Sequence, residues 1–151
     1  IERDPITKTP VWPKGITGSL SHSSGSALAV VGDSPRILGL GVDLEKANRT
    51  IDLRIESHIC TQDESEDLHT LHLENRAVRL LLTFSAKESL YKCYFGKIPR
   101  NLLRFKNVSL KWESSKWTAH WEFPLGTEFS LDATIGYWGI DQNWLWTICW
   151  R

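Results

Sequence analysis

The chain has 151 residues, 41% of them hydrophobic, and its 18 Lys and Arg side chains balance 18 Asp and Glu. This length suffices for one domain with a core, and the lack of a basic excess argues against a nucleic-acid-binding protein. No apolar run approaches the roughly 20 residues that a membrane span needs, and the start shows no signal peptide. We therefore expect a cytoplasmic protein without a membrane span. Because the sequence contains no Met, we also expect that it begins inside a longer chain.

The three cysteines, Cys60, Cys93 and Cys149, are far apart in the sequence and form no CxxC motif. This spacing favours free, buried thiols in a reducing compartment over a disulfide framework.

The first third of the chain predicts short antiparallel strands. Residues 1–18 are rich in Pro, Lys and Gly and indicate an extended segment with a turn. The strands are expected at residues 19–22, 27–31 and 36–44, separated by Ser/Gly and Gly-Asp-Ser-Pro turns.

The third of these strands ends in two acids, Asp43 and Glu45. Side chains two residues apart on a strand share a face, so these carboxylates are expected to lie side by side. Their repulsion and desolvation favour a bound Mg²⁺ or Mn²⁺, both of which prefer oxygen ligands. The simpler alternative is a strand that runs into a solvated acidic turn.

Two helices are expected in the middle of the chain. The sequence TQDE at residues 61–64 has the form of a capping box and predicts a helix to about residue 72. Residues 74–95 show apolar side chains at helical spacing, and Gly96 and Pro99 predict where this helix ends.

The long helix carries a second unusual group of side chains. Glu88 and Lys92 are four residues apart and share a helix face, which is also typical of a surface ion pair. Ser85 and Glu88 alternatively fit a capping box. In a third interpretation, Glu88 lies close to the apolar stripe and adds a carboxylate to Asp43 and Glu45.

The last third predicts strands at residues 105–112, 117–123, 129–138 and 144–150, with turns near 114–115, 124–126 and 141–143. Seven of the eight tryptophans follow residue 110. Trp144, Trp146 and Trp150 share one strand face with Ile148. Such a face can stack on bases, but core or sheet cover is its usual role.

Three blocks together resemble the 4′-phosphopantetheinyl transferases of the enterobactin-synthetase-component-D and surfactin type. KTPVWPKGITGSLSH (residues 8–22) is similar to the family's (R/K)xPxWPxGxxGSxSH. GVDLE (residues 41–45) resembles G(I/V)D(I/L)E, and FSAKESLYK (residues 84–92) resembles (F/W)(S/T)xKE(A/S)xxK. The blocks occur in the family's order and cover about residues 8–95.

The resemblance implies a role for each matching residue. Asp43, Glu45 and Glu88 are implied to hold Mg²⁺, with Mn²⁺ as the alternative. Coenzyme A phosphates are implied to contact the following residues: Lys8, Ser21, His22, Lys87 and Lys92. Lys8 stands where Arg is more usual, which keeps the charge but loses the bidentate fork.

The implied fold is α+β, with an antiparallel sheet packed on a long helix, and members of this type are pseudo-dimers of two similar halves. We expect residues 1–40 to be the end of the first half and residues 41–151 to be the second half. Most of the first half, including residues that bind the adenine side, is then missing. A further N-terminal segment or a second chain is expected to complete the site.

The implied activity is the transfer of 4′-phosphopantetheine from coenzyme A to a serine of an apo acyl or peptidyl carrier protein, with release of 3′,5′-ADP. Glu88 is the candidate base, directly or through a water, and Lys92 offsets charge on the leaving side. The alternative function is a non-catalytic module that binds coenzyme A or the carrier protein.

Four basic residues follow the long helix: Lys97, Arg100, Arg104 and Lys106. They are expected to flank the mouth of the site and to attract an acidic carrier. The alternative is a solvated basic turn.

Overall fold

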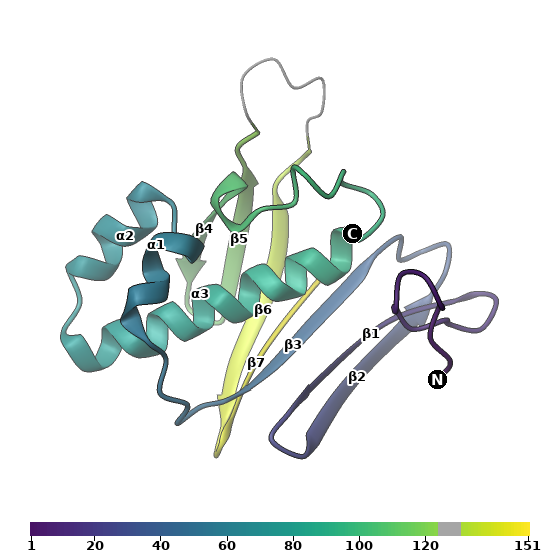
Figure 1. The fold of residues 1–151 in the computed structure, drawn as a ribbon, viewed down its shortest axis with the longest axis horizontal. Coiled ribbons are helices and arrows are strands. Elements are labelled where there is room, and N and C mark those ends of the chain that lie inside the picture. Colours follow the sequence, from purple (N-terminus) through teal and green to yellow (C-terminus); the bar gives the residue numbers. More distant parts are fainter. Residues whose placement is uncertain (124–130) are drawn as a thin grey trace.

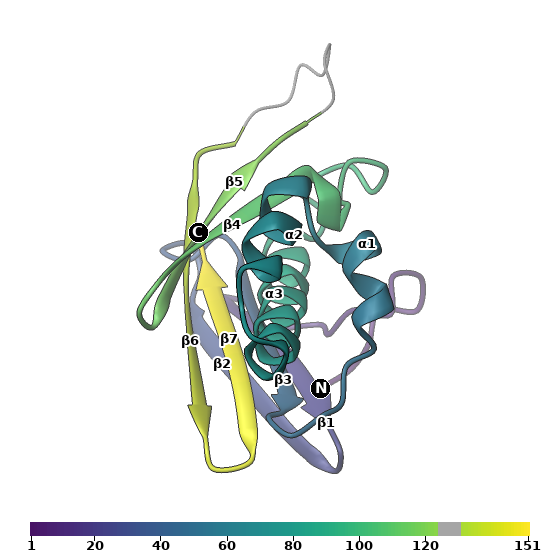
Figure 2. The ribbon, with the colours of Figure 1, turned by 90° about the vertical axis from the view of Figure 1, so that its left-hand side faces the viewer.

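The computed structural model describes residues 1–123 and 131–151 and has an α+β architecture. Five antiparallel strands form the main sheet in the order β3-β7-β6-β5-β4, and the helices lie on one face of it (Figures 1 and 2). The strands are β3 (Leu40–Lys46), β4 (Val108–Glu113), β5 (Lys116–Trp121), β6 (Thr134–Asp141) and β7 (Trp144–Trp150). The predicted fold class, an antiparallel sheet packed on a long helix, is confirmed.

A separate hairpin of β1 (Ile16–Ser23) and β2 (Ser26–Asp33) lies next to β3 (Figure 1). The hairpin turns at Ser24 and Gly25, whose φ angles of 47° and 83° fit the tight turn predicted there. A side chain ties it to the main sheet, because the Val42 N–H donates to Ser19 Oγ at 3.0 Å. The hairpin therefore positions its side chains against β3 without extending the β3 ladder.

The third predicted strand begins later than expected. The prediction started it at residue 36, but β3 begins at Leu40 and continues to Lys46. Its register is fixed by β7, which pairs Leu40 with Trp150 and Lys46 with Trp144. Residues before Leu40 lie beyond the end of this ladder, so the apolar pattern alone extends the strand too far.

Both predicted helices are confirmed. In α2 (Gln62–His69), the Thr61 and Glu64 side chains and backbone N–H groups form the complete capping box. The long α3 (Leu73–Tyr94) is followed by Gly96 at a φ of 75°, the left-handed conformation that ends many helices. Two short segments, η1 (Leu53–Ile55) and α1 (Glu56–Ile59), precede α2. None of the described helices is both long and apolar enough to cross a membrane.

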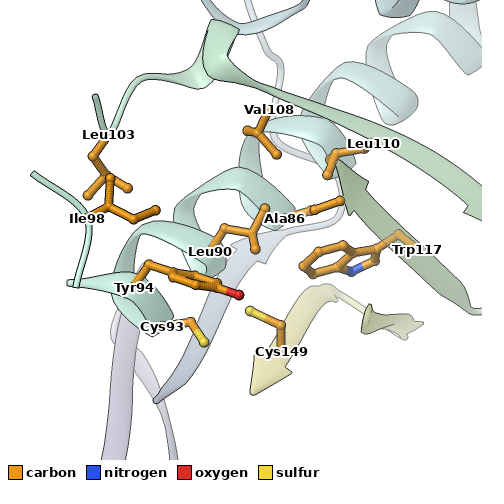
Figure 3. Close-up of a cluster of buried hydrophobic side chains, with 11 residues drawn as sticks. Ala86, Leu90, Cys93, Tyr94, Ile98, Leu103, Val108, Leu110, Trp117 and Cys149 are labelled. Carbon is orange, nitrogen blue, oxygen red and sulfur yellow. The ribbon is translucent and has the colours of Figure 1, made fainter. Parts of the chain in front are cut away.

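The main core lies between α3 and the sheet. Figure 3 shows Ala86, Leu90 and Tyr94 of α3 directed toward Trp117 of β5 and Cys149 of β7. All three cysteines are free and buried, as the sequence predicts.

The predicted tryptophan face of β7 is the outer face of the sheet. Leu145, Thr147 and Cys149 point the other way and are fully buried, whereas Trp150 is 46% exposed and stacks on Tyr137. The tryptophans of β7 thus cover the sheet and are not the core itself.

The other C-terminal strands need small corrections. A 3-10 turn, η2 (Phe105–Asn107), precedes β4, so the strand predicted from residue 105 begins at Val108. The strand predicted at 129–138 corresponds to β6, which begins at Thr134. Residues 129–130 and the turn predicted at 124–126 lie outside the described residues.

Candidate active site

The site forms where α3 crosses β3 at close range. A Cβ at Gly41 would collide with the carbonyl oxygen of Ser89, so only glycine permits this approach. Thr147, the cross-strand partner of Asp43, also donates a hydrogen bond to the Ser85 carbonyl of α3. The crossing brings the second half of α3 next to the acids of β3.

Asp43 is the centre of the site. It is only 6% exposed, and its Oδ1 accepts hydrogen bonds from Ser21 Oγ at 2.8 Å and Lys92 Nζ at 2.9 Å. Lys92 also donates to the Val42 carbonyl at 2.8 Å. The second carboxylate oxygen, Oδ2, is buried and has no hydrogen-bond partner among the described residues. One oxygen of Asp43 is therefore held by two side chains, and the other is buried and unpaired in the described part of the chain.

The other two acids, Glu45 and Glu88, belong to the same electrostatic group as Asp43. Glu45 is buried on the Asp43 face of β3 and pairs with Arg49 at 2.6 Å. Burial raises the pKa of Glu88, Asp43 and Glu45 raise it further, and Lys92 opposes the rise. The structure thus places Asp43 and Glu45 within electrostatic range of Glu88, and their joint role as metal ligands stays a prediction.

The residues fit a hard cation, although they are not arranged as its ligands. No three His, Cys, Asp or Glu side chains in residues 1–123 and 131–151 are placed to hold a metal ion. Lys92 and Arg49 form ion pairs with one carboxylate oxygen each of Asp43 and Glu45, while Asp43 Oδ2 has no partner within the described part of the chain. Oxygen donors with excess negative charge suit Mg²⁺ or Mn²⁺. The metal site stays a prediction.

A basic cavity of about 260 Å³ lies beside Asp43. Arg3, Lys8, His22 and Lys92 line it together with Ser21, and both Ser21 and Lys92 bond to Asp43. The structure thereby gathers four of the five residues predicted to contact coenzyme A phosphates. A second cavity of about 430 Å³ shares Lys8 and Lys92 and continues along Tyr91 and Phe95 at the end of α3.

Lys87, the fifth predicted phosphate contact, is elsewhere, and the structure contradicts that prediction. Its side chain is fully buried and donates to Glu64 at 2.6 Å and to the carbonyls of Ile59 and Phe105 at 2.9 Å. Burial lowers the pKa of Lys87, and Glu64 opposes the shift. Lys87 therefore ties α3 to α1, α2 and η2, and no donor is left for a phosphate.

Two other interpretations of the α3 motif are also wrong. Lys92 forms its ion pair with Asp43, so the surface pair with Glu88 is not the one observed. Ser85 lies inside α3 and hydrogen-bonds to Thr147, which excludes a capping box at Ser85.

Sequence reasoning missed Arg3 and Arg49. Glu45 lies on β3 and Arg49 follows the turn after it, so the helical i,i+4 rule gave no signal for this pair. Arg3 had no signal either, because only the path of the N-terminal loop brings it to a cavity next to Lys92.

Comparison with known proteins identifies the family. Residues 39–149 match the model of the 4′-phosphopantetheinyl transferase superfamily, and residues 3–32 match the 4′-phosphopantetheinyl transferase N-terminal domain. The chain belongs to the 4′-phosphopantetheinyl transferase superfamily. The acids and Lys92 lie in the first matched region, whereas Arg3, Lys8, Ser21 and His22 lie in the second. The division of the chain at residue 40 stays a prediction.

Curated members of this superfamily are similar to the chain over part of their length. It is 31% identical to enterobactin synthase component D of Escherichia coli O157:H7 over 123 residues, which is 76% of this chain and 57% of that protein. It is 28% identical to 4′-phosphopantetheinyl transferase PptT of Mycobacterium tuberculosis over 142 residues, 89% of this chain and 61% of that protein. The chain thus spans about half the length of these transferases.

A solved structure supports the fold. The holo-(acyl-carrier-protein) synthase of Bacillus anthracis, solved in complex with CoA (3′,5′-ADP), aligns with a TM-score of 0.53 at 17% identity. The alignment covers 76% of this chain and 95% of that one. At this identity the likeness shows a shared fold.

Proposed function

We propose that this superfamily member transfers 4′-phosphopantetheine from coenzyme A to a serine of an apo acyl or peptidyl carrier protein and releases 3′,5′-ADP. One observation carries the proposal: Asp43, which interacts with Glu88, bonds to Ser21 and Lys92 of a cavity that four basic side chains line. Coenzyme A needs both features, because its phosphates are anionic and its pyrophosphate binds divalent cations. The alternative is a non-catalytic module that binds coenzyme A or the carrier, since the chain spans only 57% of a relative such as enterobactin synthase component D.

The proposed reaction exchanges the phosphoanhydride bond of coenzyme A for a phosphoester bond to serine. The serine oxygen forms a bond to the β-phosphorus of coenzyme A, the bond from that phosphorus to the bridging oxygen breaks, and 3′,5′-ADP leaves with the electron pair. Asp43, Glu45 and Glu88 would hold Mg²⁺, or Mn²⁺ in its place, and the ion would supply positive charge to offset that of the pyrophosphate. In such transfers the protein mainly positions the reactants and stabilises charge.

Lys92 lies between Asp43 and the basic cavity. Its ammonium group bonds to Asp43 and also lines the basic cavity. We infer that it contacts the phosphates of bound coenzyme A and offsets charge on the leaving group. Ser21 and His22 contribute from β1, where the Ser21 hydroxyl fixes the hairpin to Asp43.

Glu88 is the proposed base for the serine proton. Burial and the neighbouring carboxylates raise its pKa, which makes it a better proton acceptor than an exposed glutamate. The proton passes to Glu88 directly or through one water.

Three further parts of the proposal concern context. The similarity to enterobactin synthase component D supports a carrier from siderophore or related secondary-metabolite synthesis. The free, buried cysteines fit a reducing compartment such as the cytoplasm. A further segment or a second chain completes the adenine side of the site, since the relatives are longer.

A mass measurement tests the function. The protein is mixed with Mg²⁺, coenzyme A and several apo carrier domains, and each carrier is weighed. A gain of one phosphopantetheine is expected, and it is lost with chelator. Binding of coenzyme A or carrier without any gain in mass identifies the non-catalytic module and overturns the enzyme.

A further inference from the structure

A further cavity, of about 470 Å³, lies between α2, the first half of α3 and β4, and we call it the α2–β4 cavity (Figure 1). It shares no described lining residue with either cavity beside Lys92, so it is a separate space. Its volume falls within the range of small-molecule sites in proteins, roughly 300–1,000 Å³. The proposed transfer reaction gives this cavity no role.

Part of the cavity wall is apolar. Leu68 of α2 and Leu110 of β4 are buried, and Leu71 lies just after α2. Trp112 adds a half-buried indole, and the Arg79 Cζ lies over this ring at 4.8 Å from its centroid. Such a wall suits the apolar part of a ligand, because contact between them removes apolar surface from water.

Two opposite charges line the same cavity without pairing. Arg79 belongs to α3 and Asp67 to α2, and neither side chain has a hydrogen bond or an ion pair among the described residues. The two charges nevertheless interact, because burial lowers the pKa of Arg79 and the Asp67 charge opposes that shift. Arg79 and Asp67 are therefore within electrostatic range of each other but not in contact.

The other charged residues of the lining are a buried acid and a second cation. Glu64 already has its partners, since it accepts hydrogen bonds from Lys87 and from the N–H groups of Thr61 and Leu110. Lys111 is exposed and has no ion pair in the described part of the chain. The charges left for a ligand are one carboxylate, from α2, and two cations, from α3 and β4.

The backbone of β4 adds a hydrogen-bond donor. β4 is an edge strand of the main sheet, and Leu110 N–H points away from β5, because it donates to Glu64 at 2.9 Å. Residues two apart on an antiparallel strand direct their N–H groups to the same side. The N–H of Trp112, which lines the cavity, therefore also points to the open edge of the sheet.

We propose that the α2–β4 cavity is a binding site for an α-amino acid with an apolar side chain. The ligand carboxylate binds the Arg79 guanidinium, whose planar fork matches two carboxylate oxygens. The ligand ammonium binds Asp67, and the ligand side chain packs on the apolar wall. A zwitterion suits the cavity better than a simple anion or cation, because each of its charges meets a protein charge that lacks a partner. The site does not depend on the proposed transfer reaction.

Titration of the full chain, followed by nuclear magnetic resonance, tests the proposal with the Trp112 backbone amide as reporter. The probes are L-leucine and L-phenylalanine. Two leucine analogues each lack one charge: 4-methylpentanoate has no ammonium group, and 3-methylbutylamine has no carboxylate. Leucine is expected to bind about tenfold or more tightly than either analogue, the usual effect of a hydrogen bond between charged groups.

Two variants show which protein charge binds which ligand charge. Arg79→Gln should weaken leucine binding about tenfold and leave 3-methylbutylamine binding unchanged. Asp67→Asn should weaken leucine binding about tenfold without weakening 4-methylpentanoate binding. Damage to the fold would weaken every ligand, so this crossed pattern reports the contacts themselves. Because Asp67 is exposed on α2, its variant should fold like wild type.

Asp63→Asn is the matched control. Asp63 is an exposed acid of the same helix and does not line the cavity, so leucine affinity should stay at the wild-type value. Circular dichroism checks that each variant is folded. Any of three results overturns the proposal: no saturable shift at Trp112 with leucine or phenylalanine, equal affinity for leucine and both analogues, or unchanged leucine affinity in Arg79→Gln or Asp67→Asn.

Discussion

Two lysines of α3 each form an ion pair with a carboxylate of another element, but the two pairs differ in their surroundings. Lys87 bonds to Glu64 at 2.6 Å and Lys92 bonds to Asp43 at 2.9 Å. The Lys87 side chain is 0% exposed and that of Lys92 is 29% exposed. The difference lies in what surrounds each pair.

The Lys87 pair is complete. The lysine donates to three acceptors, and Glu64 also accepts from the N–H groups of Thr61 and Leu110. The Lys92 pair is incomplete, since Asp43 Oδ2 is buried without a partner in residues 1–123 and 131–151, and Lys92 borders both cavities. A buried ion pair whose polar atoms all have hydrogen-bond partners stabilises the fold. An ion pair beside a cavity whose carboxylate keeps an unpaired oxygen is the better candidate for ligand binding.

The strongest test of this contrast replaces Asp43. Asp43→Ala is expected to lower transfer by on the order of 10³-fold, because it removes both the free oxygen and a charge next to Lys92. The variant should still fold, because the Lys92 side chain is partly exposed and water can solvate its ammonium group. Carrier mass measures transfer, and circular dichroism measures folding. Wild-type transfer in this variant, or transfer that persists with chelator, would end the metal hypothesis.

Lys87→Met is expected to act on stability instead. It leaves Glu64 buried without its cation, and breaking a buried pair in this way costs roughly 3–5 kcal/mol of unfolding free energy. Urea unfolding measures the loss. The matched variant, Lys92→Met, also leaves a buried acid, Asp43, without its cation, but it should cost less, because the Lys92 side chain is 29% exposed and Ser21 still donates to Asp43. Similar losses in the two variants would remove the distinction between the pairs.

The pH dependence of Glu64→Gln sharpens the same test. Burial lowers the pKa of Lys87, and removal of the Glu64 charge lets this pKa fall further. Between the lowered pKa and the usual 10.5, the folded protein binds fewer protons than the unfolded chain, so stability rises with pH. The variant should gain stability from pH 7 toward pH 10 more steeply than wild type.

His22→Ala tests the basic cavity beside the Lys92 pair, and its effect is expected to be smaller. His22 is exposed on β1 and lines the basic cavity, so we expect the KM for coenzyme A to rise about tenfold while kcat falls less, as for lost uniform binding. Steady-state transfer kinetics measure both constants. If wild type and variant each bind coenzyme A and 3′-dephospho-coenzyme A equally, His22 does not contact the 3′-phosphate.

The smallest effect is expected at the carrier surface. Lys97 and Arg100 are exposed after α3, and Arg100 lies over the ring of Phe95, which lines the larger cavity. Changing both to Glu should raise the KM for an acidic carrier by roughly fivefold at low salt and flatten its salt dependence. Coenzyme A binding should hardly change. Equal weakening of both substrates would indicate damage to the fold, and unaltered carrier kinetics would contradict docking there.

The sequence by itself determined the features that depend on local periodicity and capping. Strand β7 at Trp144–Trp150, the Thr61 capping box and the long α3 follow from spacing and backbone satisfaction within a few residues. The shared face of Asp43 and Glu45 is equally local, since a strand alternates by two residues.

Only the tertiary structure decided which lysine of the α3 motif borders the cavities. Lys87 and Lys92 are five residues apart, which separates them by about 140° around a helix. That spacing gives them different faces but does not say which face other elements cover. Packing of α2 and η2 buries Lys87, the crossing of β3 leaves Lys92 at the cavities, and the N-terminal loop adds Arg3 from elsewhere in the sequence. Burial and charge neighbours are set by contacts between distant segments, and no pattern within one segment encodes them.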